Sequence, residues 1–158
     1  MTNVLIVDDD EQLRRAVARV LATYDFDCHA VGTVEDAIAA ATERGPDIIL
    51  LDVALGAASG LDVHKVIRDA DSRLPAVIFT TSHRDVFSTM LDQLGPMDDW
   101  IIKPWDTAEF IARVRLAARR IVEERAAGTM PGRTSSAMLE GAIAAATSTA
   151  ETLATTVP

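Results

Sequence analysis

The sequence predicts an α/β fold: a doubly wound parallel sheet of five strands with five flanking helices, followed by a C-terminal helical tail. Short apolar runs such as 48–51 are bounded by turn residues, here Pro46 and Gly56, which is typical of strands buried on both faces. Between these runs lie segments whose apolar residues recur at helical spacing. Strands that alternate with helices indicate a parallel sheet covered on both sides.

The predicted elements follow one another in a regular order. Strands are expected at about 3–7, 28–31, 47–52, 76–79 and 100–102, and helices at about 11–21, 34–43, 61–70, 85–94 and 107–124. Asp10 and Thr33 are predicted to cap the first two helices, because their short side chains accept hydrogen bonds from the free N–H groups of a first turn. Gly45 is predicted to end the second helix.

Length and composition set limits on the class of protein. A chain of 158 residues has room for one domain with a full core and a short appendage. The net charge of −9 argues against a nucleic-acid-binding surface, which needs clustered Lys and Arg. One cysteine, Cys28, allows no intramolecular disulfide and no zinc ligand set. The sequence has neither a signal peptide pattern nor an apolar run long enough to span a membrane, so we expect a cytoplasmic protein.

Polar side chains stand where the predicted strands end. Asp8 and Asp9 follow the first strand, Asp52 ends the third, Thr80 the fourth and Lys103 the fifth. The carboxyl ends of parallel strands meet at one edge of the sheet, and sites in such folds form there. Asp52 alone is equally well explained as a turn or helix-capping residue. The convergence of all five side chains favours a functional site instead.

The chemistry of this set indicates a site for a phosphoryl group. Three carboxylates a few ångström apart repel one another unless a cation lies among them. Mg²⁺ suits a site of few protein carboxylates completed by water and phosphate oxygens. Lys103 adds a positive charge and Thr80 a hydroxyl donor. Such groups neutralise and position a transferring phosphoryl group, and a carboxylate can itself be the nucleophile that forms an aspartyl-phosphate.

Four segments together resemble the receiver domain of bacterial two-component response regulators. They are 6–10 (Ile-Val-Asp-Asp-Asp), 47–52 (Asp-Ile-Ile-Leu-Leu-Asp), 74–80 (Leu-Pro-Ala-Val-Ile-Phe-Thr) and 102–105 (Ile-Lys-Pro-Trp). Each segment alone is weak, but the ordered set, each at a strand end, is specific. The resemblance covers about residues 2–124 and implies a flavodoxin-like sheet with strand order 2-1-3-4-5.

The resemblance also implies roles for these residues. Asp52 would accept a phosphoryl group from a sensor histidine kinase or a histidine phosphotransfer protein. Asp8, Asp9, Asp52 and the backbone carbonyl of Ala54 would hold Mg²⁺. Lys103 and Thr80 would contact the phosphoryl oxygens. Thr80 and Trp100 would form a switch pair that signals to an output protein, and the Lys103–Pro104 peptide bond would be cis.

The sequence departs from the family pattern at several positions. The segment 95–100 is one residue longer than usual, which would reshape the face around Trp100 that receivers generally use for output. Gly56 stands where proline is frequent, so the loop after Asp52 is expected to be looser. Asp98 and Asp99 are expected in a solvated loop, and the three histidines, His29, His64 and His83, are given no role because they form no evident cluster.

The sequence predicts three regions: a receiver domain at 1–125, a linker at 126–135 that is rich in Gly and Pro, and a tail at 136–158. Leu139, Ile143, Ala146, Ala150 and Leu153 recur at intervals of four and three, which predicts a helix with one apolar seam. This helix would dock on its own domain or pair with a second copy in a homodimer. A frayed tail is an equally good interpretation, because threonines and the short length weaken an isolated helix.

Two other functions fit an α/β fold of this kind. A Mg²⁺-dependent phosphohydrolase also uses an aspartyl nucleophile, but such enzymes usually keep a second aspartate two residues later, where this chain has Ala54. A flavodoxin-like cofactor binder needs a Ser/Thr/Gly-rich phosphate loop after the first strand, which is missing here. The favoured function is therefore a signalling switch that catalyses only its own phosphorylation and dephosphorylation.

Overall fold

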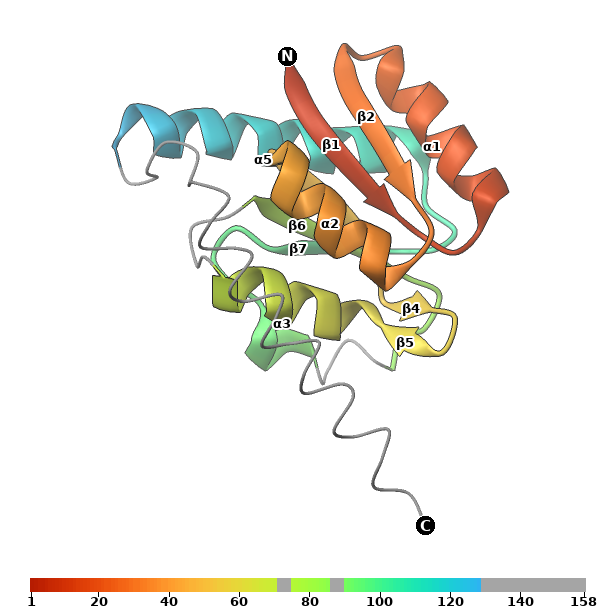
Figure 1. Ribbon diagram of the computed structural model, residues 1–158. Coiled ribbons are helices and arrows are strands. Elements are labelled where there is room, and N and C mark those ends of the chain that lie inside the picture. The colour runs from red at the N-terminus through yellow and green to blue at the C-terminus, as the bar shows by residue number, and fades with distance from the viewer. Residues whose placement is uncertain (71–74, 86–89, 129–158) are drawn as a thin grey trace.

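The computed structural model describes residues 1–70, 75–85 and 90–128 (Figure 1). The strands are β1 (Thr2–Val7), β2 (Phe26–Val31), β3 (Ile48–Asp52), β4 (Ala54–Leu55), β5 (Ala58–Ser59), β6 (Ala76–Thr81) and β7 (Asp99–Ile102). The helices are α1 (Glu11–Ala22), α2 (Val34–Arg44), α3 (Gly60–Ala70), the 3₁₀ turn η1 (Leu91–Gln93) and α5 (Thr107–Ala126).

The main sheet has the predicted order. Its five strands run β2-β1-β3-β6-β7, and all neighbours are parallel, so the predicted order 2-1-3-4-5 is confirmed. The order reverses at β1, where the chain first leaves to the β2 side and then crosses to β3. In register, Val7 pairs with Leu51 and Asp52 pairs with Thr80. The carboxyl ends of β1, β3 and β6 therefore lie at one edge.

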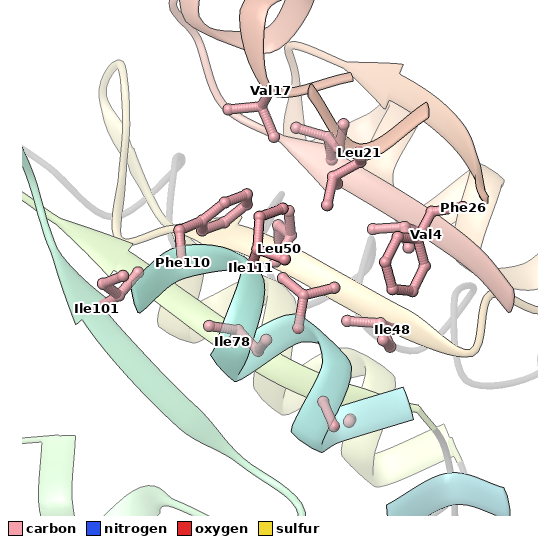
Figure 2. Close-up of a cluster of buried hydrophobic side chains, with 14 of the residues drawn as sticks. Val4, Val17, Leu21, Phe26, Ile48, Leu50, Ile78, Ile101, Phe110 and Ile111 are labelled. Atoms are coloured by element: carbon pink, nitrogen blue, oxygen red, sulfur yellow. The ribbon is translucent and has the colours of Figure 1, made fainter. Parts of the chain in front are cut away.

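Each face of the sheet buries its own apolar cluster. On one face, α1 and α5 cover a cluster that includes Val17, Leu50 and Phe110 (Figure 2). On the other face, α2 and α3 cover a second cluster that includes Leu51 and Phe79. All five residues of β3 are buried, as a central strand requires. Burying an apolar side chain of this size stabilises the fold by about 1.5–3 kcal/mol, so these clusters make the edge of the sheet a rigid support for polar groups.

Helix capping agrees with the sequence. The Asp10 side chain accepts hydrogen bonds from the N–H groups of Gln12 and Leu13 at the start of α1, and Thr33 accepts one from Asp36 at the start of α2. Gly45 ends α2 in the left-handed conformation (φ +53°), which glycine adopts without steric cost.

Three features differ from the prediction or lie beyond the described residues. The segment after Asp52 is a short hairpin, β4 and β5, rather than a loose loop, and Gly56 turns it with φ +61°. Of the predicted helix at 85–94, residues 86–89 lie outside the described residues, Met90 is α-helical and the 3₁₀ turn η1 follows it. Most of the predicted linker and the whole predicted tail also lie outside them. No helix in the described ranges combines the length and apolarity needed to cross a membrane.

Candidate functional site

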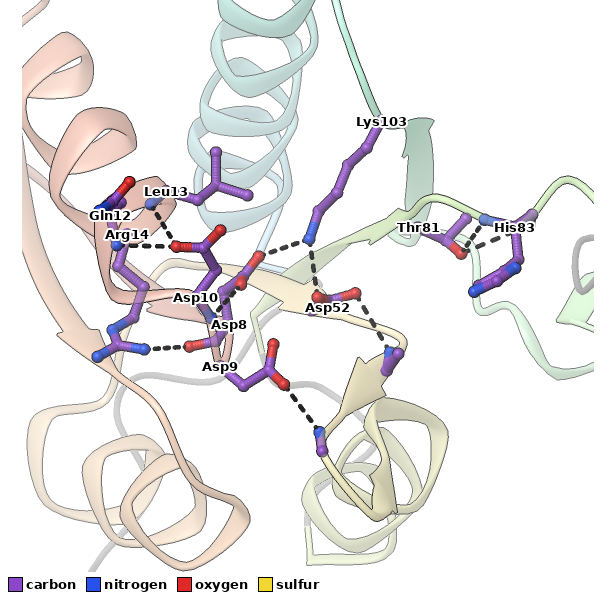
Figure 3. Close-up of polar contacts among 12 residues, drawn as sticks. Asp8, Asp9, Asp10, Gln12, Leu13, Arg14, Asp52, Thr81, His83 and Lys103 are labelled. Atoms are coloured by element: carbon purple, nitrogen blue, oxygen red, sulfur yellow. Dashed lines mark hydrogen bonds and ion pairs between the residues drawn. The ribbon is translucent and has the colours of Figure 1, made fainter.

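Three charged side chains meet at the carboxyl edge of the sheet. Lys103 follows β7, and its Nζ donates to Asp8 Oδ2 at 2.6 Å and to Asp52 Oδ2 at 2.7 Å (Figure 3). The three side chains are only 16 %, 6 % and 9 % exposed, in the order lysine, Asp8, Asp52. Ala54, at the start of β4, donates its N–H to the other Asp52 oxygen at 3.2 Å. One ammonium group therefore bridges two nearly buried carboxylates from different strands.

Asp9 completes an acidic cluster. One carboxylate oxygen from each of Asp8, Asp9 and Asp52 lies within 4.8 Å of the other two. Asp9 is exposed, and its Oδ2 accepts a hydrogen bond from the N–H of Gly56 at 3.1 Å. The β4–β5 turn thus supports Asp9 from a segment 47 residues away.

Burial and the Lys103 charge act in opposite directions on the pKa of Asp52. Burial is the largest influence on Asp52 and raises the pKa of its carboxyl group; Lys103 opposes this, Asp8 adds to it, and the net pKa is raised. Burial acts to lower the pKa of Lys103, but the hydrogen bonds and charges of Asp52 and Asp8 outweigh it and raise that pKa. The two shifts have different causes: burial is the largest influence on Asp52, whereas the two neighbouring carboxylates raise the pKa of Lys103.

This donor set fits a hard divalent cation. It offers carboxylate oxygens at the separation that a shared ion requires, on one exposed and two buried residues. Ala54, whose carbonyl oxygen is the fourth predicted ligand, is exposed and is next to the cluster through its N–H contact with Asp52. The cluster is thus an acidic site of the type that binds Mg²⁺ in receiver domains.

Thr80 and Trp100 lie on different sides of the sheet. Thr80 is buried, pairs with Asp52 in the β3–β6 register, and lines a small cavity on the α1–α5 side together with Asp8 and Trp105. Trp100 pairs with Phe79, one residue earlier on β6, and packs against the α2–α3 cluster. The structure therefore brings Thr80 to the acidic cluster but does not place Trp100 on the same face.

The Lys103–Pro104 peptide bond is cis, as predicted. Trp105 is partly buried against the α1–α5 cluster, where its ring stacks on Phe110 with 5.1 Å between ring centroids.

Gly60 is a site residue that the sequence reasoning missed. It begins α3, and its N–H donates to Val53 at 2.8 Å, which brings the helix against the end of β3. A Cβ atom at this position would lie 2.1 Å from the backbone oxygen of Asp52. Only a residue without a side chain permits this approach. The glycine was visible in the sequence, but its close neighbour depends on how the β4–β5 hairpin folds back.

We expect Gly60→Ala to destabilise the protein by about 1–3 kcal/mol, because the clash is with backbone atoms that cannot rotate away. The free energy of unfolding from urea titration measures this. The substitution should also reduce Mg²⁺ affinity, since Asp52 must shift. A free energy within about 0.5 kcal/mol of wild type would contradict the close approach.

A second missed group is the buried cluster of His64, Arg68 and Asp98. His64 Nε2 lies 2.7 Å from Asp98 Oδ2, and Arg68 contacts the other carboxylate oxygen. The Asp98 side chain is fully buried, so its expected place in a solvated loop is wrong. His64 is buried as well and packs edge-on against Phe79, so it does have a structural role. The spacing of His64 and Arg68, four residues apart beside the apolar residues of one helix, was the available signal.

Comparison with known proteins agrees with this site. Residues 4–115 match the response regulator receiver domain family. The fold is similar to the BeF3-activated N-terminal receiver domain of RstA from Klebsiella pneumoniae, with 25 % identity and a TM-score of 0.64 over 75 % of this chain and 99 % of that one. A two-component response regulator from Clostridium difficile has the same fold, with 24 % identity and a TM-score of 0.69 over 77 % and 98 % of the two chains.

Curated relatives are similar in sequence over the same region. The DNA-binding response regulator MtrA of Mycolicibacterium smegmatis is 37 % identical over 123 residues, which cover 78 % of this chain and 53 % of that protein. The sensory transduction protein RegX3 of the same organism is 37 % identical over 132 residues, or 84 % and 57 % of the two chains. This chain thus spans little more than half the length of these relatives. On the match over residues 4–115 and these identities, the chain belongs to the response regulator receiver domain family of two-component systems.

Proposed function

We propose that this chain accepts a phosphoryl group on Asp52 and signals through the change in shape that follows. The observation that supports this most directly is the Asp52 carboxylate, nearly buried, 2.7 Å from Lys103 and within 4.8 Å of Asp8 and Asp9 oxygens. A carboxylate that lacks sufficient positive charge in its own fold is suited to bind a cation and to become covalently modified.

The transfer step needs a donor with a labile phosphorus–nitrogen bond. A phosphohistidine of a sensor histidine kinase or of a histidine phosphotransfer protein has the right chemistry. One Asp52 carboxylate oxygen forms the new bond to phosphorus, the bond between phosphorus and the imidazole nitrogen breaks, and the imidazole leaves with the electron pair. Lys103 would then exchange its contact with the Asp52 carboxylate for a phosphoryl oxygen, and the Thr80 hydroxyl would donate to another.

Magnesium would be held by the carboxylates of Asp8, Asp9 and Asp52 and by the carbonyl oxygen of Ala54. When bound, it supplies the positive charge that offsets the phosphoryl oxygens and the acidic side chains. Asp8 also accepts a hydrogen bond from Lys103 at 2.6 Å, which would keep the lysine directed at the site while Asp52 reacts.

The signal would pass from Thr80 to the surface around Trp100. The two side chains start on opposite faces of the sheet, so coupling between them runs through the β6–β7 backbone, where Phe79 pairs with Trp100. The partner for output would be a further protein. The tail at 136–158 would in addition allow two copies of the chain to form a homodimer. MtrA is a DNA-binding regulator by name, whereas the net charge of −9 gives this chain no evident nucleic-acid surface. This switch would act in the cytoplasm.

Mass spectrometry of the intact protein tests the phosphorylation. With a small acyl phosphate and Mg²⁺, the wild type should gain about 80 Da, the mass of one phosphoryl group. Asp52→Asn should gain none, because an amide is not a nucleophile of this kind. Beryllofluoride, used with the RstA receiver, should quench or enhance the tryptophan fluorescence of the wild type and leave that of Asp52→Asn unchanged.

The outcome also separates the switch from a phosphohydrolase. A switch retains the label and releases it slowly, whereas a hydrolase turns over the acyl phosphate and other phosphoesters many times. Labelling of Asp52→Asn to the wild-type level would rule out Asp52 as the acceptor.

A further inference from the structure

Arg14 makes a contact with the site through the protein backbone. Its Nη1 donates to the backbone oxygen of Asp8 at 2.6 Å (Figure 3). That oxygen belongs to the peptide group that joins Asp8 to Asp9. Because a peptide group is planar, a fixed carbonyl also fixes the direction of the Asp9 N–H and of the Asp9 Cα. The arginine on α1 therefore sets the path of the chain between two carboxylates of the acidic cluster.

The space for the guanidinium group is provided by Gly32. A Cβ atom at Gly32, just after β2, would lie 2.7 Å from Arg14 Nη1 and 3.1 Å from its Cζ. Both are atoms at the far end of a flexible side chain, so an added methyl group would displace the guanidinium without forcing the backbone apart. Gly32 and Arg14 thus form one arrangement, in which the missing side chain of one residue accommodates the other.

Asp9 depends on this backbone contact more than its neighbours do. Asp8 and Asp52 are buried and held by Lys103, whereas Asp9 is exposed and contacts the N–H of Gly56 at 3.1 Å. An exposed side chain has several accessible rotamers, so the orientation of its backbone decides which of them reach the cluster.

We propose that Arg14 is a positioning residue for metal binding: it holds the Asp8–Asp9 peptide so that both carboxylates face the ion. The inference rests on the proposed function, since it assigns the acidic cluster to Mg²⁺. Groups that orient metal ligands without touching the metal typically change its affinity by about 10–100-fold when they are replaced.

The direction in which Mg²⁺ affinity changes when Arg14 is replaced distinguishes a positioning role from a purely electrostatic one. Arg14 is a cation near the cluster, so its charge alone repels Mg²⁺, and removal of that charge would tighten binding. Positioning predicts the opposite, because loss of the hydrogen bond frees the Asp8–Asp9 peptide. Gly32→Ala provides an independent version of the same change, since it displaces the guanidinium but keeps its charge.

The experiment is a Mg²⁺ titration followed by tryptophan fluorescence, in which Trp105 reports from the small cavity it shares with Asp8. We expect Arg14→Gln and Gly32→Ala each to weaken Mg²⁺ about tenfold. Arg14→Lys, which can still donate to the Asp8 oxygen, should stay within about threefold of wild type. At saturating Mg²⁺, the labelling rate of Asp52 by an acyl phosphate should return to near the wild-type value in all three variants.

Arg15→Gln is the matched control, because Arg15 lies on the same helix, is 75 % exposed and pairs with Glu11. It removes the same charge and should leave Mg²⁺ affinity unchanged. Thermal unfolding of each variant verifies that it is folded. Tighter or unchanged Mg²⁺ binding in both Arg14→Gln and Gly32→Ala would overturn the inference. Failure of the proposed function would give a different result. Asp52 would not be labelled in the wild type, whereas the Mg²⁺ titrations would still show weaker binding in Arg14→Gln and Gly32→Ala than in the wild type.

Discussion

Replacing Asp98 by alanine is expected to lower the free energy of unfolding by about 3–5 kcal/mol. The carboxylate is fully buried and accepts hydrogen bonds from the N–H of Gly95 at 2.7 Å, from His64 and from Arg68. Without it, the Arg68 charge, on a side chain that is only 17 % exposed, loses its partner in the cluster. Urea titrations at pH 7 measure the loss.

The tautomer of His64 follows from the same geometry. To donate to Asp98 at 2.7 Å, Nε2 must carry a proton. Arg68 Nε also lies 3.3 Å from that nitrogen, but two donors cannot share a hydrogen bond, so this approach is a packing contact. Arg68 donates instead to Asp98 and to the backbone oxygen of Pro75 at 2.9 Å. Asp98 is therefore the acceptor on which the cluster depends.

Asp99→Ala is the matched control. Asp99 is the next residue and also pairs with an arginine, Arg113, at 3.0 Å, but that pair is 25–31 % exposed. Partly exposed pairs contribute about 1 kcal/mol or less. If the two substitutions lower the free energy of unfolding equally, the burial of Asp98 does not increase the contribution of its ion pair to stability.

The cluster also gives the stability a defined pH dependence. Burial acts to raise the pKa of Asp98, but the hydrogen bond from His64, the charge of Arg68 and the N–H of Gly95 outweigh it and lower that pKa. A carboxyl group with a lowered pKa in the folded state stabilises the fold above its unfolded pKa of about 3.9, and this contribution disappears as the pH falls through the folded value. The difference in Tm between wild type and Asp98→Asn should thus be largest at neutral pH and shrink below about pH 4.

Lys103→Met is expected to destabilise the Mg²⁺-free protein by about 3 kcal/mol or more, because Asp8 and Asp52 are then left nearly buried without their shared cation. Asp52→Asn should have the opposite effect and raise Tm slightly, since it removes the cost of burying the Asp52 charge and also its repulsion with Asp8. Differential scanning calorimetry of both variants in a chelating buffer measures the two shifts.

Mg²⁺ provides the control for this pair of substitutions. A bound cation stabilises the folded state by mass action, and its effect grows with the negative charge of the site. The rise in Tm on addition of Mg²⁺ should be larger in Lys103→Met than in wild type and smaller in Asp52→Asn. If Lys103→Met and the wild type have the same Tm in the chelating buffer, Lys103 does not compensate the two buried carboxylates.

The acidic edge could be predicted from the sequence because it depends on local signals. Each apolar run ends in its polar residue within the chain itself, and parallel strands bring their ends together whatever their side chains are. Asp8, Asp52 and Lys103 therefore meet as expected. The lengths of the strands around them were predicted to within about two residues.

The buried Asp98 could not be predicted in this way. It stands beside another aspartate in a polar segment, and local polarity indicates exposure. Its burial depends on His64 and Arg68, which are 34 and 30 residues away on α3. The same reason applies to Gly60, whose neighbour is the backbone of Asp52. Thr80 and Trp100 lie on different faces because side chains alternate along a strand, and the position of a residue at a strand end does not fix its face.

One further consequence concerns α5, which begins four residues after Lys103 and is held at its far end. Arg125, in its last turn, pairs with Asp47 at 2.6 Å, and Asp47 also accepts the N–H of Asn3 at 2.8 Å, at the opposite edge of the sheet from the phosphorylation site. A helix of 20 residues is a rod of about 30 Å. With a hinge at one end, a tilt of about 5° moves the other end by about 3 Å. The Arg125–Asp47 pair would act as the pivot of such a motion, so a displacement at the acidic edge would tilt α5 about its far end.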